Sequence, residues 1–500
     1  MSISTLNKAL LVPLLLVLAD PALAHGDHSH IEDGQATSPE PIDGILWAHI
    51  MMMGLAFGII FPLGMVLGMI RSKWHVPVQI AGSVIAFVAY FLGHAHKGRQ
   101  FAKNVHASFA NVLMLLLIVQ IALGVYLKLH IEKGFQGRIR RWFVLAHGII
   151  GKIMPVLSWM QIVFGSITAW GFCRGSHLGQ CLAHFIMGSA FIAYGILLTI
   201  LLLVGQFWLR RTGRSQEFFD STVIAVWGCF NTFTEHRWGT DWVKNDLQHT
   251  TMGIIWWAAG LLGMFLSRKR NGQPKRNLIP AIVIGVTGWA MGGHPQALHI
   301  SEAVHTVFGY CLMAAGAARI IEISFVLNDR ATISPDGSDP HSFQYVTPFM
   351  LCASGFMFMG ATEEQMIFLA DHHITHVAYI LILFSCAFVL FLFVNILLHI
   401  YAVHSWPRSA NYDPTHATHT RTDDSLDFDN AIAMHGLSGH RNTTAPSLEN
   451  SQQVRDAQEF ELEGLIGSDD GGRDDEEIGE PGPTQRQKDL EAARGLSSAR

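Results

Sequence analysis

The sequence predicts an all-α, polytopic transmembrane helical bundle. Half of its 500 residues are hydrophobic and only 15% are charged, which is more apolar chain than a soluble core would use. The apolar residues are also gathered into long stretches, many of them close to the ~20 residues that cross a bilayer as a helix. The lipid bilayer is therefore the first partner expected for this chain.

The first 24 residues have the pattern of a cleaved signal peptide. The apolar stretch 9–18 is too short for a span, follows Lys8 and precedes the small residues Ala22-Leu23-Ala24. Cleavage after Ala24 would leave a luminal, histidine-rich stub over residues 25–44. An uncleaved anchor is the alternative interpretation.

Apolar segments then follow one another for most of the chain, separated by short polar loops. Their lengths and composition predict eleven spans. They cover residues 45–70, 77–93, 105–127, 142–170, 182–209, 221–233, 249–266, 278–291, 304–326, 343–360 and 374–403.

Basic loops predict the orientation of these spans. With a luminal mature N-terminus, Arg71 and Lys73, the loop 128–141 and the loop 210–214 all face the cytosol, as the positive-inside rule requires. Segment 221–233 is short for a span, but leaving it out would place the basic loop 268–276 outside. We therefore keep it as a tilted or partly buried helix.

The composition changes after the last span. Residues 405–500 are rich in Asp, Glu, Gly, Ser, Gln and Pro and contain acidic blocks at 469–470 and 474–477. Such a segment has too little apolar surface to fold, which predicts a disordered, acidic, cytosolic tail.

Six cysteines are too few for a disulfide framework. Cys173 and Cys181, however, share one short loop that the predicted topology makes luminal, where a disulfide could form. The other four cysteines are expected to be packing residues.

Four histidines stand near the starts of the first four apolar segments: His49, His75, His106 and His147. Because consecutive membrane helices reverse direction, His49 and His106 should lie near one membrane face and His75 and His147 near the other. Two facing pairs would be suited to two haems stacked across the bilayer. For any one histidine, a role as an interfacial side chain is the alternative.

Small and amide residues accompany these histidines at helical spacing, including Gly64, Gln120 with Gly124, and Gln161 with Gly165. Segment 45–209 resembles the transmembrane core of the cytochrome b-561 family, especially the DOMON-type proteins related to ferric reductases. The resemblance implies two haems b, with His49 paired with His106 and His75 with His147. Phe57, Ala110 and the short loop 71–74 depart from the family pattern.

The second half, residues 215–404, resembles the C-terminal region of the fungal YTP-like family. The matching words lie at residues 227–237, 248–253, 287–296 and 319–322. The resemblance implies an integral membrane protein related to electron-transport components, and it gives no substrate.

The predicted topology also brings histidines and carboxylates of the second half to the luminal side. Imidazole and carboxylate together bind copper, iron or zinc. The alternative is an ordinary polar layer at helix ends. The candidate metal ligands are Glu235, His236, His249, His294, His299 and His305.

Two functions remain open from the sequence. One is a transmembrane oxidoreductase of the metalloreductase type, which passes electrons from a cytosolic, ascorbate-like donor to a luminal ferric or cupric ion or radical. The other is a non-haem metal-binding protein or transporter that uses the luminal cluster. Either would reside in a secretory-pathway membrane, namely that of the ER, vacuole, endosome or cell surface. A nucleic-acid partner is not expected, because basic residues gather only in the cytosolic loops.

Overall fold

The described part of the chain consists of helices and their connecting loops. The computed structural model describes residues 35–129, 135–236, 239, 241–242, 244–293, 295–328 and 340–405. The predicted signal peptide, residues 25–34 of the stub, His294 and the tail from residue 406 lie outside these ranges. Within them there is no β-strand, and only two isolated bridges pair Thr37 with Phe101 and Arg268 with Pro274.

The first half forms four helical rods. Asp43 and Asn104 start two of them, since their side-chain oxygens accept the backbone N–H groups of Leu46 and Ala107 at 2.8 Å. The first rod joins three segments without a break, and its middle is a π-helical turn. The rods are α2 (Gly44–Leu55) with η2 (Ala56–Ile60) and α3 (Phe61–Met69), then α4 (His75–Ala95), α5 (Val105–Lys128) and α6 (Phe135–Trp170).

The second half contains more and shorter helices. The long ones are α7 (Leu178–Leu203), α9 (Gln216–Thr234), α10 (Lys244–Leu266), α11 (Ile279–Gly292), α12 (His299–Ile321), α13 (Val346–Met359) and α15 (His376–Ser405). Shorter elements are η3 (Gly175–His177), α8 (Gln206–Arg211), η4 (Glu322–Val326), η5 (Ser342–Tyr345) and α14 (Glu363–Asp371).

Each of the eleven predicted spans contains a helix, so the all-α membrane bundle is confirmed. By length and composition, eight of the described helices can cross a bilayer, or nine if the pair α13 and α14, bent by 72°, counts as one span. The prediction of eleven full spans is too high, because α9 and α11 do not have the length and apolar composition needed to cross a bilayer. Buried Glu217 and Asp220 make α9 more polar, and the 14 residues of α11 extend only about 21 Å against the ~30 Å of the hydrocarbon core.

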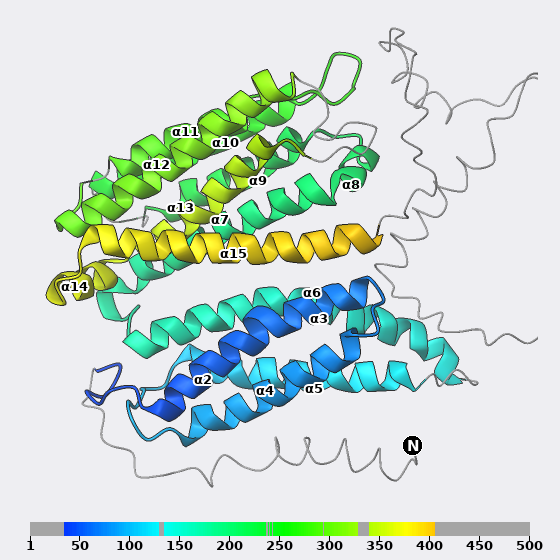
Figure 1. The fold of residues 1–500 in the computed structure, drawn as a ribbon. Helices are drawn as coiled ribbons and strands as arrows, with labels where there is room; N and C mark the ends of the chain where they lie inside the picture. Colours follow the sequence, from blue (N-terminus) through cyan, green and yellow to red (C-terminus); the bar gives the residue numbers. More distant parts are fainter. Residues whose placement is uncertain are drawn as a thin grey trace, which may run out of the picture.

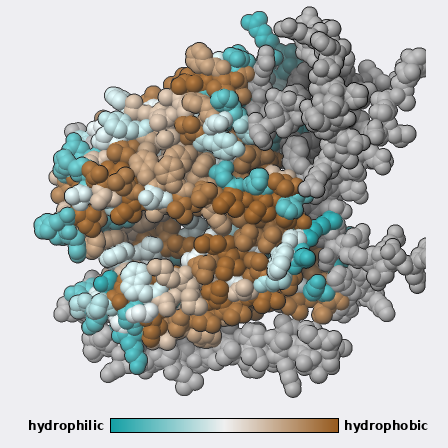
Figure 2. Space-filling view, viewed as in Figure 1, coloured by the Kyte–Doolittle hydropathy of each residue, from teal (hydrophilic) through white to brown (hydrophobic). Residues whose placement is uncertain are grey.

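The helices form two bundles that share α15. Figure 1 shows α2–α6 as one bundle, α7–α14 as the other, and α15 running between them. Helix α15 contacts α3 on one side and α7 and α13 on the other, and the Trp159 indole N–H donates to Ser189 Oγ at 3.0 Å to join α6 to α7. Figure 2 shows apolar residues over the middle of the visible face and hydrophilic residues at its ends, as expected for a membrane-embedded protein.

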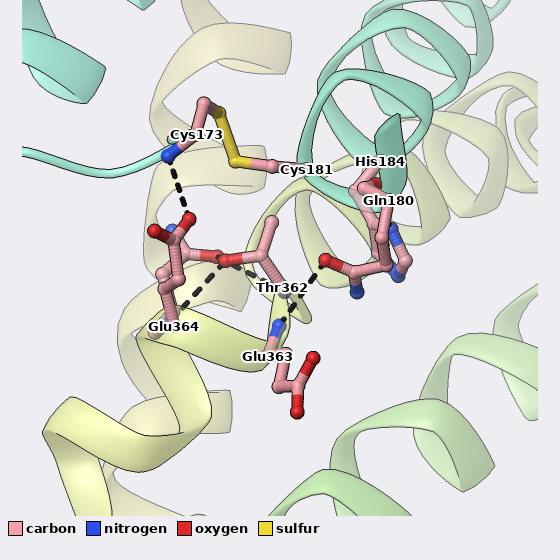
Figure 3. Close-up of a disulfide and its surroundings, with 8 residues drawn as sticks. Cys173, Gln180, Cys181, His184, Thr362, Glu363 and Glu364 are labelled. Carbon is pink, nitrogen blue, oxygen red and sulfur yellow. Dashed lines mark hydrogen bonds between the residues drawn. A yellow bond between two sulfur atoms is a disulfide. The ribbon is translucent and has the colours of Figure 1, made fainter. Parts of the chain in front are cut away.

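The loop between α6 and α7 contains the disulfide that the sequence allowed, between Cys173 and Cys181. Figure 3 shows Glu364, near the start of α14, receiving the Cys173 backbone N–H. This bond is 2.6 Å long, and the neighbouring Glu363 contacts His177 at 3.1 Å. The disulfide loop is thus fastened to α14, which lies far away in the sequence.

Replacing Cys173 and Cys181 with serine is expected to lower the free energy of unfolding by about 2–3 kcal/mol, because the unfolded chain regains the entropy of a short loop. The measurement is the thermal unfolding midpoint in detergent. Cys386→Ser, at an exposed free cysteine, is the control and should leave the midpoint unchanged. A denatured wild-type protein with six titratable thiols instead of four would contradict the assignment.

Candidate bis-histidine sites

The four N-terminal histidines meet in two pairs. The ring centroids of His49 and His106 lie 6.3 Å apart with an interplanar angle of 87°, and those of His75 and His147 lie 6.4 Å apart at 90°. Two imidazoles bound in line to one metal ion through nitrogens at ~2.0 Å place their centroids roughly 6 Å apart. Both pairs therefore have the spacing of two axial ligands.

Each pair joins one helix of the α2–α4 hairpin to one helix of the α5–α6 hairpin. His49 Nδ1–H donates to the Ala89 carbonyl and His75 Nδ1–H to the Gly64 carbonyl, both at 2.7 Å. His106 Nδ1–H donates to the Gln161 carbonyl at 3.3 Å. A histidine that binds metal through one nitrogen commonly donates the other N–H to such a partner, so Nε2 is the nitrogen left for an ion.

His147 and His106 are also held through their backbone carbonyls. The Gln120 side-chain amide donates to the His147 carbonyl at 3.0 Å, and Gln161 does the same for His106. The Gln120 backbone carbonyl faces the His147 imidazole, as the other three carbonyls face their histidines. The two glutamines predicted to serve the site therefore fix the ligand helices.

Each ring packs against a glycine of its hairpin partner. A Cβ built at Gly93 or Gly68 would lie 2.7 or 2.8 Å from the ring of His49 or His75, and at Gly165 or Gly124 it would lie 3.0 or 3.3 Å from His106 or His147. Any larger side chain would push the imidazole away. Of these glycines, Gly68 and Gly93 were missed by the sequence analysis.

A repeated spacing explains all four contacts. Three glycines lie 18 positions after the histidine of their own helix, as Gly93 lies after His75. The residue whose carbonyl faces the histidine ring of the hairpin partner lies four positions before that glycine. In the first rod the distance from His49 to Gly68 is 19 positions, and this rod alone contains the π-helical turn η2 between the two. A π-helical turn accommodates one extra residue, so the glycine returns to the same face.

The same spacing sets the distance between the two pairs. On α4, α5 and α6, 14 positions separate the histidine from the residue whose carbonyl faces the other site, as from His75 to Ala89. At ~1.5 Å per residue the sites lie about 21 Å apart along the helices. They therefore occupy opposite ends of the bundle.

Asp43 closes the end of the bundle near His49. Its carboxylate accepts the backbone N–H groups of Lys97 at 2.9 Å, Leu46 at 2.8 Å and Gly98 at 3.2 Å. These bonds, that from Lys97 foremost, lower the pKa of Asp43 below its usual value. The start of α2 is thereby tied to the loop before α5, which brings His49 and His106 to the same level.

The predicted metal ligands of the second half form separate contacts. Glu235 lies 3.4 Å from His249, and His236 donates to Asp246 at 3.0 Å while stacking on Trp242. Among the described residues, no three of the predicted ligands bring their ligand atoms within 4.8 Å of one another. One three-residue group does meet that distance, Cys173, Cys181 and Glu364, but its cysteines are already joined to each other.

His299 and His305 each face a histidine outside the predicted set. The ring of His299 lies 5.4 Å from His376, and that of His305 lies 5.8 Å from His184. Phe358 stacks on His184 at 4.4 Å, so the second contact is packed into the apolar core. No polar spacing in the sequence indicated His184.

Comparison with known proteins relates most of the second half of the chain to a described family. A family described as "Protein YTP1-like, C-terminal" matches residues 157–402, and a domain of unknown function, DUF2427, matches residues 29–130. Protein YTP1 of Saccharomyces cerevisiae is 48% identical over 258 residues, which cover 51% of this chain and 54% of that protein. Residues 157–402 of this membrane protein are therefore YTP1-like.

Another relative is less similar to this chain. An uncharacterized membrane protein of Schizosaccharomyces pombe is 24% identical over 443 residues, covering 64% of this chain and 86% of its own length. The chain spans about half the length of the Saccharomyces cerevisiae protein it matches, and no solved structure matches it. His49, His75 and His106 fall within the DUF2427 match, and His147 lies between the two matched regions.

Proposed function

We propose that the first half of this protein holds two haems b and passes single electrons across the membrane. His49 and His106 would bind one haem, and His75 and His147 the other. The observation that supports this most is the occurrence of two imidazole pairs, each with the spacing of axial ligands, at opposite ends of one bundle. The bound group would supply reversible one-electron chemistry.

The surrounding residues fit such a group. The carbonyls of Ala89, Gly64 and Gln161 fix three imidazoles by Nδ1, and glycines leave room beside all four rings. Each pair would hold its haem through two histidines, and a group held in this way would supply electron transfer.

The donor side would be the end that holds His75 and His147. The positive-inside rule places this end in the cytosol, and the basic residues nearby could bind an anionic donor such as ascorbate. The donor gives up one electron and a proton, and a luminal ferric or cupric ion gains the electron. The basic residues are Lys73, Lys128, Arg138, Arg140 and Arg141.

The transfer can be tested in vesicles that contain the purified protein, with ascorbate trapped inside and ferricyanide outside. The proposal predicts reduction of external ferricyanide at a rate that rises with the amount of protein, and loss of this activity in His75→Ala. Protein that contains haem but reduces ferricyanide no faster than empty vesicles would contradict the proposed function.

Gly93→Leu is expected to remove the haem held by His49 and His106 without preventing insertion, because the new side chain would occupy the place of the His49 ring. The measurement is haem per polypeptide, which should fall by about half when one of two bis-histidine sites is lost. Gly179→Leu is the control, since a Cβ at this helical glycine meets nothing within 4 Å. Full haem content in Gly93→Leu would show that the glycine contact is unimportant.

A second candidate function is metal binding or transport without haem. The imidazole–carboxylate contacts of His249 with Glu235 and of His236 with Asp246 favour it, since a copper, iron or zinc ion could bind at either. The double variant His236→Ala, His249→Ala should then contain less bound metal than wild type. If the variant and wild type had equal metal content and equal metal-reductase activity, these residues would be only a polar layer at the helix ends.

A further inference from the structure

The second half encloses a cavity that the proposed electron path does not use. Its volume is about 400 Å³, within the range of sites for small organic molecules. Its walls come from α7, α9, α10, α11, α12 and α13, and they are largely apolar. Representative lining residues are Phe191, Leu198, Trp227, Val283 and Leu351.

One part of this cavity is polar. Asp220, Arg319, Tyr194 and Thr347 line it, and the Tyr194 hydroxyl donates to the Asp220 carboxylate. Thr347 is only 6% exposed. Its hydroxyl has no hydrogen-bond partner among the described residues. A buried hydroxyl of this kind is costly unless a ligand or water satisfies it.

The ionisable groups next to this polar part include more carboxylates than guanidinium groups. Arg319 donates to Glu217 and Glu322, and Arg276 donates to Glu217, each at 2.8 Å. Together with Asp220, three carboxylates face two guanidinium groups, which leaves one negative charge when all are ionised. Both arginines bind the glutamates, whereas Asp220 has a neutral phenol as its hydrogen-bond donor. Of the three carboxylates, Asp220 lines the cavity, beside Arg319, so a ligand can reach the excess negative charge there.

The cavity also reaches the outer surface of the bundle. Val223 and Val226 of α9 line it and are 50% and 66% exposed. Exposed apolar side chains on a membrane helix face lipid, so a molecule could enter sideways from the bilayer.

We propose that this cavity binds a lipid-soluble amine, a molecule with one cationic head group and an apolar tail. The ammonium group would lie at Asp220, donate to its carboxylate and supply the missing positive charge. The tail would lie against the aromatic and aliphatic walls, and aromatic side chains such as those of Tyr194 and Trp227 favour a nearby cation. The site shares no residue with the histidine pairs and does not depend on the proposed electron transfer.

The test is saturable binding of tritiated dodecylamine to the full-length protein in detergent, with dodecanol and dodecanoate as competitors that have the same tail. Dodecylamine itself should compete best and dodecanoate worst. Asp220→Asn keeps the shape of the side chain and should weaken binding by about tenfold or more, as expected for the loss of a charge-assisted hydrogen bond. Asp371→Asn, at an exposed residue of α14, should bind like wild type.

A second variant tests whether misfolding could explain a loss of dodecylamine binding. Ala190→Phe adds a ring to the cavity wall and should abolish binding while the protein still elutes as a single species. In wild type, a photoreactive dodecylamine should label peptides of the helices that line the cavity, α7 and α9–α13. Equal affinity in wild type and Asp220→Asn, equal competition by dodecanol or dodecanoate, or labelling elsewhere would overturn the proposal.

Discussion

His106→Ala should leave the protein inserted in the membrane but with roughly half of its haem, because each proposed site takes both axial ligands from its own pair. His147→Ala should remove the other half. The measurement is haem per polypeptide by the pyridine haemochrome method, combined with the reduced absorption spectrum of each variant. The two variants should lack different components of that spectrum.

His184→Ala is the matched control for this prediction. His184 is buried and, like His106, meets a second histidine edge to face, at 5.8 Å from His305, but Phe358 stacks on its ring and occupies the space that a porphyrin would need. This variant should keep all of the haem. An unchanged haem content in His106→Ala, or loss of the same spectral component in His106→Ala and His147→Ala, would contradict the assignment.

Glu217→Ala is expected to destabilise the second half by about 3–5 kcal/mol, because it removes one partner of a buried ion network. The Glu217 side chain is 1% exposed and binds both Arg276 and Arg319, whose side chains are 9% and 10% exposed. Without Glu217, Arg276 and Arg319 each lose a carboxylate partner in a buried setting. The measurement is the thermal unfolding midpoint in detergent, followed by the fraction of protein that stays monodisperse.

Glu363→Ala provides the comparison on the surface. Glu363 contacts His177 at 3.1 Å, but the two side chains are 56% and 41% exposed. Exposed ion pairs contribute about 0–1 kcal/mol, so this variant should unfold close to wild type. If Glu217→Ala unfolded at the same temperature as Glu363→Ala, the buried network would not stabilise the fold.

The arrangement of the first half could be predicted largely from the sequence. Alternation of helix direction was enough to pair His49 with His106 and His75 with His147, and both pairs are close in the structure. The disulfide between Cys173 and Cys181 followed from their short separation. The role of Gly68 could not be predicted, because the π-helical turn η2 shifts its spacing from His49 by one position.

The second half was predicted less well because helix rotation decides which polar residues meet. Residues at the same end of a bundle need not contact one another. His249, His236 and His305 each have different neighbours. The buried network around Glu217 was missed, since the sequence around α9 was treated as a short apolar span. Its partner Arg319 lies 102 positions away, too far for any local pattern to indicate.

The absorption spectrum of the purified full-length protein, before and after reduction with dithionite, tests the central proposal most directly. Two bis-histidine haems in different surroundings predict split α bands in the reduced spectrum and two haems per polypeptide. A protein that is folded and monodisperse, was expressed with sufficient haem, and still shows an empty visible spectrum would contradict the account.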